Sequence, residues 1–229
     1  MISVVLRFQI AKHHHTDYEA AYLQLVEMLQ RFPGSDTWYC EVNAPGQVPL
    51  RLDDAPAVLH RLRVRAELAP VRTFSASLLN RPTGQRVPGL INMDYSPGVG
   101  TITVVVNRPD DVQPNPTRWI AGIMLAVLES ELGTRYAFAD VYDRLNGRFV
   151  NYHDACASYP GRHCLGWMAY VRRAVSAAEM PQAALILPAP GGSIVVSVDG
   201  AFKLADKKHV RVANVLEMRM YELGLLPVF

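Results

Sequence analysis

The sequence predicts an α+β fold in which about four helices pack on a mixed, largely antiparallel sheet or pair of sheets. Strand and helix patterns follow one another irregularly along the 229 residues, which disfavours a regular array of parallel β-α-β units. The turn-forming run Ser96-Pro97-Gly98-Val99-Gly100 separates two strand patterns, as is typical of adjacent antiparallel strands. Half of the residues are hydrophobic and 19% are charged, so the chain can bury a core without disulfides or a metal ion. We expect a single domain over residues 1–229, with two sublobes at about 1–110 and 111–229 as the alternative division.

The N-terminal segment predicts a strand followed by a helix. Residues Ile2–Ile10 are rich in β-branched and aromatic side chains, which favours a strand. The run Thr16-Asp17-Tyr18-Glu19 has the pattern of a capping box, with Thr16 as the expected N-cap. Apolar residues then recur on one helical face until Pro33-Gly34 ends the helix; they are Tyr18, Tyr22, Leu25, Leu29 and Phe32.

The next segment predicts a short strand, a helix and several strands. Residues 37–42 suit a short strand, and Asp53-Asp54-Ala55-Pro56 suits the start of a helix. That helix should bury Leu59, Leu62 and Ala66. Strand patterns follow over Phe74–Leu79, Leu90–Tyr95 and Thr101–Asn107.

A central helix is predicted after these strands, with Asn115 as N-cap and Pro116 at its first position. We expect it to end at Gly133. The apolar run Trp119–Leu128 is about half of the roughly 20 residues that a membrane span needs, so it predicts a buried helix.

The C-terminal part has less regular patterns. Residues 136–150 show no clean period, residues 151–161 suggest a polar loop, and Pro188-Ala189-Pro190-Gly191-Gly192 suggests a second loop. Strands are expected over 163–171, 183–187 and 194–198. A final helix is expected over Lys207–Leu223, because Ala213, Leu216, Met220 and Leu223 recur on one face.

Charge and cysteine content exclude several classes of protein. The chain has 23 Lys and Arg against 21 Asp and Glu, a net charge of +2, which is neither the basic composition of a nucleic-acid-binding protein nor that of an acidic DNA mimic. Three cysteines, Cys40, Cys156 and Cys164, lack the spacing of a disulfide framework and indicate a reducing compartment. Arg7 and Gln9 interrupt the first apolar stretch, so we expect no signal peptide. The cytoplasm is the expected location.

Two clusters contain residue types that bind metals. His13 and His15 would point the same way on an extended strand, with Asp17 close in sequence. His153, Cys156, His163 and Cys164 are zinc-ligand types, but their spacing fits no finger or ribbon. Both clusters are more simply explained as surface or buried polar residues, and we nominate no metal or cofactor ligand.

The sequence also lacks the usual motifs of nucleophilic catalysis and nucleotide binding. It contains no Gly-x-Ser-x-Gly run, and Gly98-Val99-Gly100 leads into a strand where a phosphate-binding loop would lead into a helix. We nominate no catalytic residue. A metal-dependent hydrolase that uses the His and Cys residues remains one alternative, and a dimeric structural scaffold is another.

Four runs in the last third of the chain carry a resemblance to a known family. They are Leu165-Gly166-Trp167-Met168-Ala169-Tyr170, Met180-Pro181-Gln182-Ala183, Gly191-Gly192-Ser193-Ile194-Val195-Val196, and the ending from Lys208-His209 to Leu225-Leu226-Pro227. In this order they resemble the immunity protein 52 family, antidotes of bacterial polymorphic toxin and type VI secretion systems. The resemblance implies a non-enzymatic protein without cofactors. Such a protein binds and neutralises a cognate nuclease toxin effector of the restriction-endonuclease-like class in the cytoplasm, with no direct contact to nucleic acid or membrane.

The segment from Glu129 to Gly161 is the predicted contact surface for such a toxin. Acidic residues outnumber arginines there, and we expect charge pairs around an aromatic core. A solvated face with partly buried aromatic residues is the alternative. The predicted toxin-binding residues are Glu129, Glu131, Asp140, Tyr142, Asp143, Phe149, Tyr152 and Asp154. Trp167, Met168 and Tyr170 put bulk on both faces of a strand, which predicts core packing instead.

Overall fold

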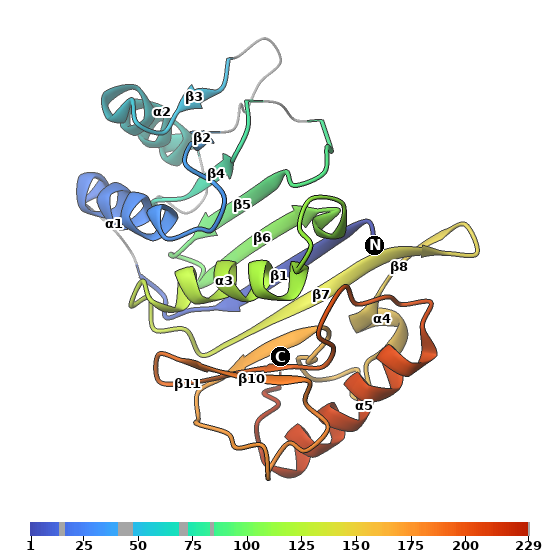
Figure 1. Cartoon of the computed structure of the whole chain (residues 1–229). Helices are drawn as coiled ribbons and strands as arrows, with labels where there is room; N and C mark the ends of the chain where they lie inside the picture. The colour runs from blue at the N-terminus through green and yellow to red at the C-terminus, as the bar shows by residue number, and fades with distance from the viewer. Residues whose placement is uncertain (14–16, 41–47, 69–72, 83–84, 229) are drawn as a thin grey trace.

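The fold is α+β, as predicted, and is built on one antiparallel sheet (Figure 1). The computed structural model describes residues 1–13, 17–40, 48–68, 73–82 and 85–228. In these residues an eleven-stranded sheet has the order β10-β11-β9-β7-β1-β6-β5-β4-β2-β3, with β8 paired to β7. The strands are β1 (Ser3–Gln9), β2 (Tyr39–Cys40), β3 (Leu50–Arg51), β4 (Ala76–Leu79), β5 (Ile91–Ser96), β6 (Thr101–Asn107), β7 (Tyr136–Leu145), β8 (Arg148–Asn151), β9 (Met168–Val171), β10 (Leu185–Ala189) and β11 (Gly192–Val196).

Five α-helices and one 3-10 turn are described around this sheet. The helices are α1 (Tyr18–Gln30), α2 (Ala55–Leu68), α3 (Pro116–Leu128), α4 (Tyr152–Cys156) and α5 (Lys207–Glu222), and the 3-10 turn is η1 (Pro109–Asp111). The count exceeds the predicted four by the five-residue α4. None of the described helices is long and apolar enough to cross a bilayer.

The first strand lies in the middle of the sheet, between β6 and β7. Its seven residues pair along their whole length with both neighbours, Val5 opposite Val105 on one side and Asp140 on the other. Alternate β1 side chains therefore point to opposite faces. Leu6 and Phe8 point to one face and Arg7 to the other.

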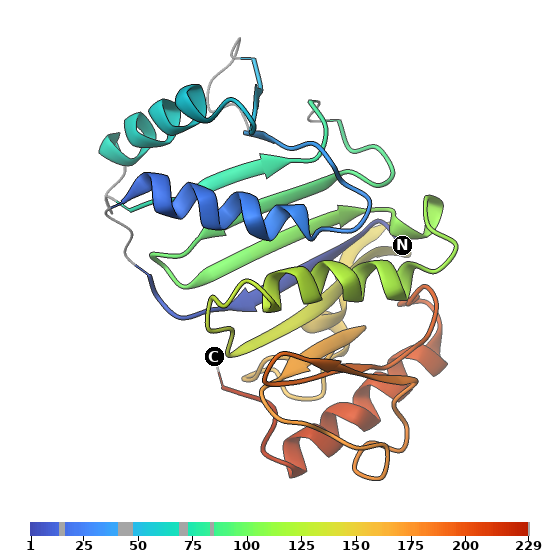
Figure 2. The same ribbon diagram turned by 60° about the vertical axis from the view of Figure 1, so that its left-hand side comes forward.

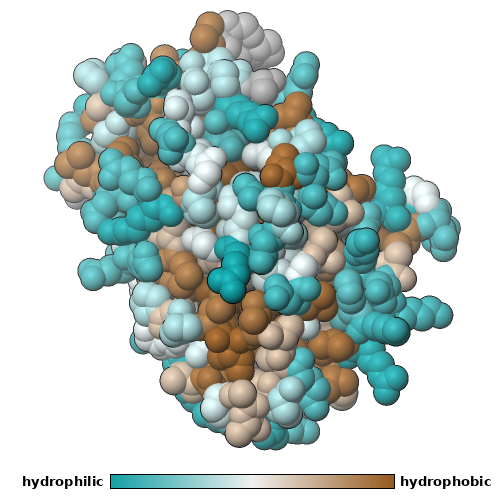
Figure 3. Space-filling model, viewed as in Figure 1, coloured by the Kyte–Doolittle hydropathy of each residue, from teal (hydrophilic) through white to brown (hydrophobic). Residues whose placement is uncertain are grey.

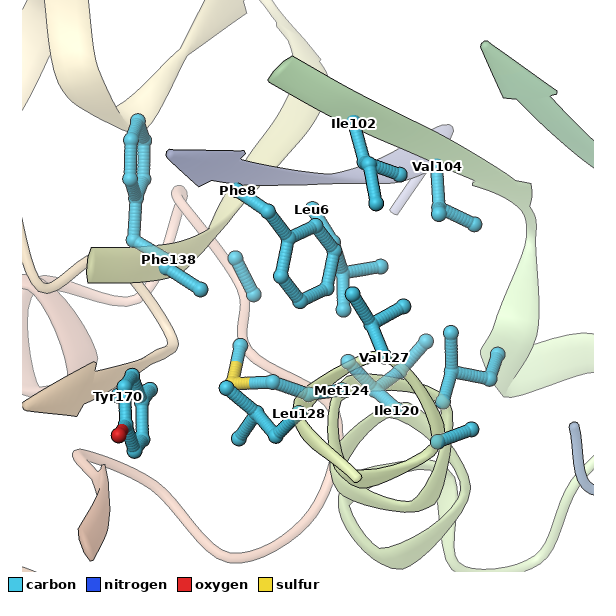
Figure 4. Close-up of a cluster of buried hydrophobic side chains, with 14 of the residues drawn as sticks. Leu6, Phe8, Ile102, Val104, Ile120, Met124, Val127, Leu128, Phe138 and Tyr170 are labelled. Atoms are coloured by element: carbon cyan, nitrogen blue, oxygen red, sulfur yellow. The ribbon is translucent and has the colours of Figure 1, made fainter. Parts of the chain in front are cut away.

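Helices α1, α2 and α3 cover the first of these faces (Figure 2). Ile120, Met124 and Val127 of α3 are fully buried and pack toward Leu6 and Phe8 (Figure 4). Burying apolar side chains of this size contributes roughly 1.5–3 kcal/mol each, so this contact contributes substantially to the stability of the core.

The predicted caps of α3 are only partly correct. Asn115 accepts a hydrogen bond from the Arg118 amide and Pro116 begins the helix, as predicted. The helix ends at Leu128, before the expected Gly133. The Ser130 hydroxyl donates to the Val127 carbonyl at 2.6 Å, and Glu131 takes a left-handed φ of 57°. These two features turn the chain before it reaches the glycine.

Helices α4 and α5 lie on the second face and cover only part of it. The His153 amide at the start of α4 donates to Asp140 of β7, and Glu217 of α5 accepts from the Leu165 amide. Strand β6 shows the difference between the faces: Ile102 and Val104 are buried, whereas Thr101 and Thr103 retain solvent contact. We call the uncovered side chains of β1, β5 and β6 the open face.

Four other expectations need correction or qualification. Thr16 lies outside the described residues, and the side chain that caps α1 is that of Asp17, which accepts from the Ala20 amide. The irregular segment 136–150 forms the ten-residue β7 and the start of β8, and the expected polar loop from 151 begins with α4. Pro188, expected in a loop, lies in β10, an edge strand where its missing N–H needs no partner.

Apolar side chains reach the surface around this edge. Figure 3 shows them gathered over β10 and β11, below α3, while hydrophilic residues cover most of the remaining view. Leu185, Ile186 and Leu187 of β10 are half-buried there.

Candidate functional site

Two adjoining cavities form a groove along the open face. The first, of about 340 Å³, lies between β1 and α4, and the second, of about 520 Å³, lies between β5 and the β7–β8 hairpin. Arg7 and Tyr142 line both, so we treat the cavities as one open-face groove. Other lining residues are Gln9, Thr101, Thr103, Phe138, Asn151, His153, Asp154 and His163 in the first cavity, and Ser3, Val5, Leu79, Arg86, Leu90, Asn92, Val105, Asn107 and Phe149 in the second.

Arg7 is fixed at the junction of the two cavities by a buried carboxylate. Its Nη1 donates to Asp140 Oδ2 at 3.1 Å and its Nη2 donates to the Tyr142 hydroxyl at 2.8 Å. Asp140 has no exposed surface and also accepts from the His153 amide at 3.2 Å. Burial raises the pKa of Asp140, while the His153 amide and Arg7 oppose that rise. The guanidinium is therefore held in one orientation, with 40% of the Arg7 side chain exposed.

Histidines and aromatic rings form the inner end of the groove. The His163 ring stacks on Tyr136 with 5.5 Å between ring centroids, and its Nε2 is hydrogen-bonded to Gln9 Nε2 at 2.6 Å. Burial lowers the pKa of His163, and the charges of His153 and Arg7 lower it further. His163 is therefore neutral at neutral pH and serves as an aromatic and hydrogen-bonding wall.

The outer end is the β7–β8 hairpin. Asn146 and Gly147 at its tip both have positive φ, 51° and 79°, as a two-residue turn of type I′ requires. Phe149 stands opposite Arg144 in the register, and its ring lies 5.6 Å from that of Tyr142. Phe149 is 54% exposed, so the hairpin presents an aromatic surface next to the second cavity.

The predicted toxin-binding residues do not form one patch. Tyr142 and Phe149 line the groove, Asp154 lies at its inner end, and Asp140 lies beneath it. The other four lie elsewhere. Tyr152 is fully buried with its hydroxyl on the Asn214 side chain, Asp143 lies 3.7 Å from the Met1 amino group, and Glu129 and Glu131 line a separate cavity with Arg31.

The two acidic members of the set that lie at or beneath the groove already have partners. Asp140 is paired with Arg7, and Asp154 is hydrogen-bonded to His153 Nδ1 at 2.9 Å and to Asn151. A count of charges along the segment therefore overestimates the negative surface that it presents. This is why the described residues of the groove do not form the expected acidic patch.

Sequence reasoning missed Arg7, Gln9 and Arg86 as site residues. Arg7 and Gln9 were visible as polar residues in an otherwise apolar strand, which indicates a face that is not covered by the core. Asn146-Gly147 was the second available signal, because this dipeptide between strand patterns favours a hairpin.

The residues named above as metal-ligand types, together with Ser193, which follows Gly191-Gly192, are not arranged for metal binding or nucleophilic catalysis in the described part of the chain. No three His, Cys, Asp or Glu side chains there are grouped to hold a metal ion, and His15 lies outside the described residues. Burial raises the thiol pKa values of Cys156 and Cys164, which lowers their nucleophilicity. Ser193 Oγ accepts a hydrogen bond from the Val175 amide and is buried, which is a structural role.

The chain is similar in fold to a protein of known structure. No protein-family model and no curated protein sequence matches it. Among solved structures it is similar to the T6SS protein PA0821 of Pseudomonas aeruginosa, with a TM-score of 0.52 and 11% sequence identity. The similarity covers 96% of this chain and 76% of that one. At 11% sequence identity this comparison shows a similarity of fold alone.

Proposed function

We propose that this chain is an immunity protein of a type VI secretion or polymorphic toxin system. It binds a cognate nuclease effector of the restriction-endonuclease-like class in the cytoplasm and neutralises it without catalysis. The open-face groove, with its fixed Arg7 and exposed Phe149, is the observation that carries this proposal. The fold likeness to a protein named for type VI secretion and the four C-terminal runs support it from other directions.

The groove has the composition of a protein-binding surface. Arginine and the large aromatic residues are the side chains that contribute most to protein interfaces, especially where they surround a desolvated centre. Arg7, Tyr142 and Phe149 supply this combination on a rigid sheet. A partner that inserts one or two side chains would meet donors that are already oriented, so little conformational entropy is lost on binding.

The protonation states in the first cavity also favour binding over catalysis. A general base works best when its pKa lies near the working pH and its proton acceptor faces the substrate. The pKa of His163 is lowered and its Nε2 is hydrogen-bonded to Gln9, while Asp140 is buried beneath Arg7. These groups stabilise one another and are suited to maintaining the shape of the groove.

Co-expression with the neighbouring open reading frame tests the proposal. We expect that frame to arrest growth when it is expressed alone. Expression of this chain should restore growth, and the two proteins should co-purify as a complex. Continued arrest without a complex would refute the antidote role. An unfolded control, such as a variant with Trp167→Asp in the core, should fail to rescue and shows that protection requires the folded protein.

A further inference from the structure

The second cavity of the groove has an unbalanced charge. Among the described residues its only charged lining side chains are those of Arg7 and Arg86, and both are cationic. The remaining lining is apolar or neutral: Val5, Val105 and Phe149 are examples of the apolar part, and the amide side chains of Asn92 and Asn107 belong to the neutral part. Arg7 is already paired with the buried Asp140, so the uncompensated positive charge in this cavity is that of Arg86. An anionic group that enters would meet this charge and hydrogen-bond donors above a floor that includes Val5 and Val105.

The nearby carboxylates in the described residues do not neutralise Arg86. Asp140 is buried and engaged by Arg7 and by the His153 amide. Asp94 of β5, which is paired with Thr103 of β6, accepts a hydrogen bond from the Ser77 hydroxyl at 2.7 Å. Asp143 lies next to the Met1 amino group. Arg86 itself is exposed, so it can contact an incoming anion without first losing an ion pair that holds the fold together.

An aromatic surface adjoins this positive charge. Phe149 is 54% exposed, and it packs against Tyr142, whose hydroxyl accepts from Arg7. An exposed aromatic ring next to arginines suits a partner that presents an apolar side chain beside carboxylates. A bare phosphate or a single metabolite would leave the ring uncovered.

We infer that the second cavity is the docking site for an acidic segment of a partner protein, whose carboxylates bind Arg86 beside the Asp140-paired Arg7 and whose neighbouring apolar side chain covers Phe149. The identity of that partner as a toxin effector rests on the proposed function, but the chemistry of the segment does not. A protein segment is favoured over nucleic acid because the net charge is only +2, and one uncompensated arginine beside an exposed aromatic ring fits a few carboxylates better than a continuous phosphate backbone.

Two single substitutions and one control test the inference. Arg86→Glu reverses the exposed charge, and Phe149→Ala removes the exposed ring. Both positions are at the surface, so the fold should survive. The matched control is Arg118→Glu, a charge reversal at an exposed position of α3 on the opposite side of the sheet. Circular dichroism and thermal unfolding should be unchanged in all three variants.

Binding of the purified effector should distinguish these variants by titration calorimetry. We expect Arg86→Glu to weaken the affinity at least tenfold, Phe149→Ala about tenfold, and Arg118→Glu less than twofold. Raising NaCl should weaken the wild-type complex more than the Arg86→Glu complex, since screening acts on the charge that this variant has lost. A tight complex that is indifferent to both groove substitutions would refute the docking site while leaving the antidote role intact.

A probe that does not depend on the effector keeps the two proposals separate. The peptide Asp-Phe-Asp-Phe-Asp should shift the amide resonances of Val105, Phe149 and their neighbours in the wild-type protein, and the analogue with Asn in place of Asp should not. Absence of shifts, shifts on another surface, or equal shifts in Arg86→Glu would overturn the inference. Binding of a DNA duplex that is lost in Arg86→Glu would also overturn it in favour of a nucleic-acid site.

Discussion

Replacing Arg7 by methionine would test whether its guanidinium holds a buried carboxylate in place. Methionine keeps an unbranched apolar stem of similar length but removes the hydrogen bonds to Asp140 Oδ2 and to the Tyr142 hydroxyl. Asp140 would remain fully buried, with the His153 amide as its remaining partner. The fold would then contain a carboxylate without its counter-charge.

The expected loss of stability follows from the geometry of the pair. At the 3.1 Å separation of Arg7 Nη1 and Asp140 Oδ2, Coulomb's law gives about 5 kcal/mol at an effective dielectric constant of about 20 and about 1 kcal/mol in bulk water. Removing one partner of a buried pair typically costs about 3–5 kcal/mol, and the 40% exposure of Arg7 reduces this through solvent screening. We expect the free energy of unfolding to fall by about 2–4 kcal/mol at pH 7.

This loss should depend on pH in a definite direction. Burial raises the pKa of Asp140, so the folded state binds its proton more tightly than the unfolded chain does. An acid of this kind contributes stability that is fully present below the unfolded pKa and is lost as pH rises through the folded pKa. Without Arg7 the folded pKa rises further. The variant should therefore be less destabilised at pH 4 than at pH 7.

Urea unfolding of wild type, Arg7→Met, Asp140→Asn and the double variant at both pH values measures these terms. The double variant should be less destabilised than the sum of the two single variants, because the amide that replaces the Asp140 carboxylate leaves no unpaired charge in the core. Arg118→Met, at an exposed site on α3, should change stability by less than about 0.5 kcal/mol. A loss below about 1 kcal/mol, or one of equal size at pH 4 and pH 7, would refute this account of the pair.

Three further predictions concern the support of the groove. Gly166 has a φ of 59°, and an added Cβ would collide with the Ala139 carbonyl. Gly166→Ala should therefore lower the unfolding temperature strongly or prevent folding. The control Gly161→Ala has open space around the added Cβ and should leave the unfolding temperature nearly unchanged. Glu217 accepts hydrogen bonds from two backbone amides. Glu217→Ala should therefore lower the free energy of unfolding in urea by about 2–4 kcal/mol. A decrease under about 1 kcal/mol would indicate that the two amides find other acceptors. Burial lowers the pKa of His163, so the folded state binds fewer protons at this residue than the unfolded state does. The free energy of unfolding should therefore fall as pH drops below about 6.5, and His163→Gln should make that fall smaller between pH 7 and pH 5. An unchanged pH dependence in the variant would show that other groups cause the fall.

The sequence was informative where local physics decides the structure. The first strand, the apolar face of α1, the β5–β6 hairpin and the start of α3 each follow from a period of two or 3.6 residues or from a capping residue, and each was predicted. Strand β7 was not predicted, because its first six residues are buried on both faces and lose the alternation that identifies a strand. Pairing of β1 with β6 and β7 joins residues that lie far apart in the sequence, such as Val5 with Val105 and Asp140, which no local pattern encodes.

The groove was harder to predict because it depends on this long-range pairing. Arg7 meets Asp140 only when β1 lies beside β7, and a segment read in isolation shows Asp140 as an unpaired acidic residue. The same error raised the apparent negative charge of residues 129–161. The Asn146-Gly147 turn, in contrast, is a local signal that favours a hairpin next to the exposed Phe149, but no hairpin was predicted from it.

The sign of the charge in the groove changes how an antidote of this composition would recognise its partner. A net charge of +2 gives no overall attraction to a basic protein, so an acidic patch would have had to act locally against the charge of the whole chain. Asp140 is paired internally with Arg7, Glu129 and Glu131 lie in a separate cavity, and the exposed Arg86 faces the second cavity. Local and overall charge then have the same sign, and both favour a partner with an acidic segment. For this reason charge reversal at Arg86 should affect affinity far more than reversal of Glu129 or Glu131, which lie in a separate cavity beside Arg31.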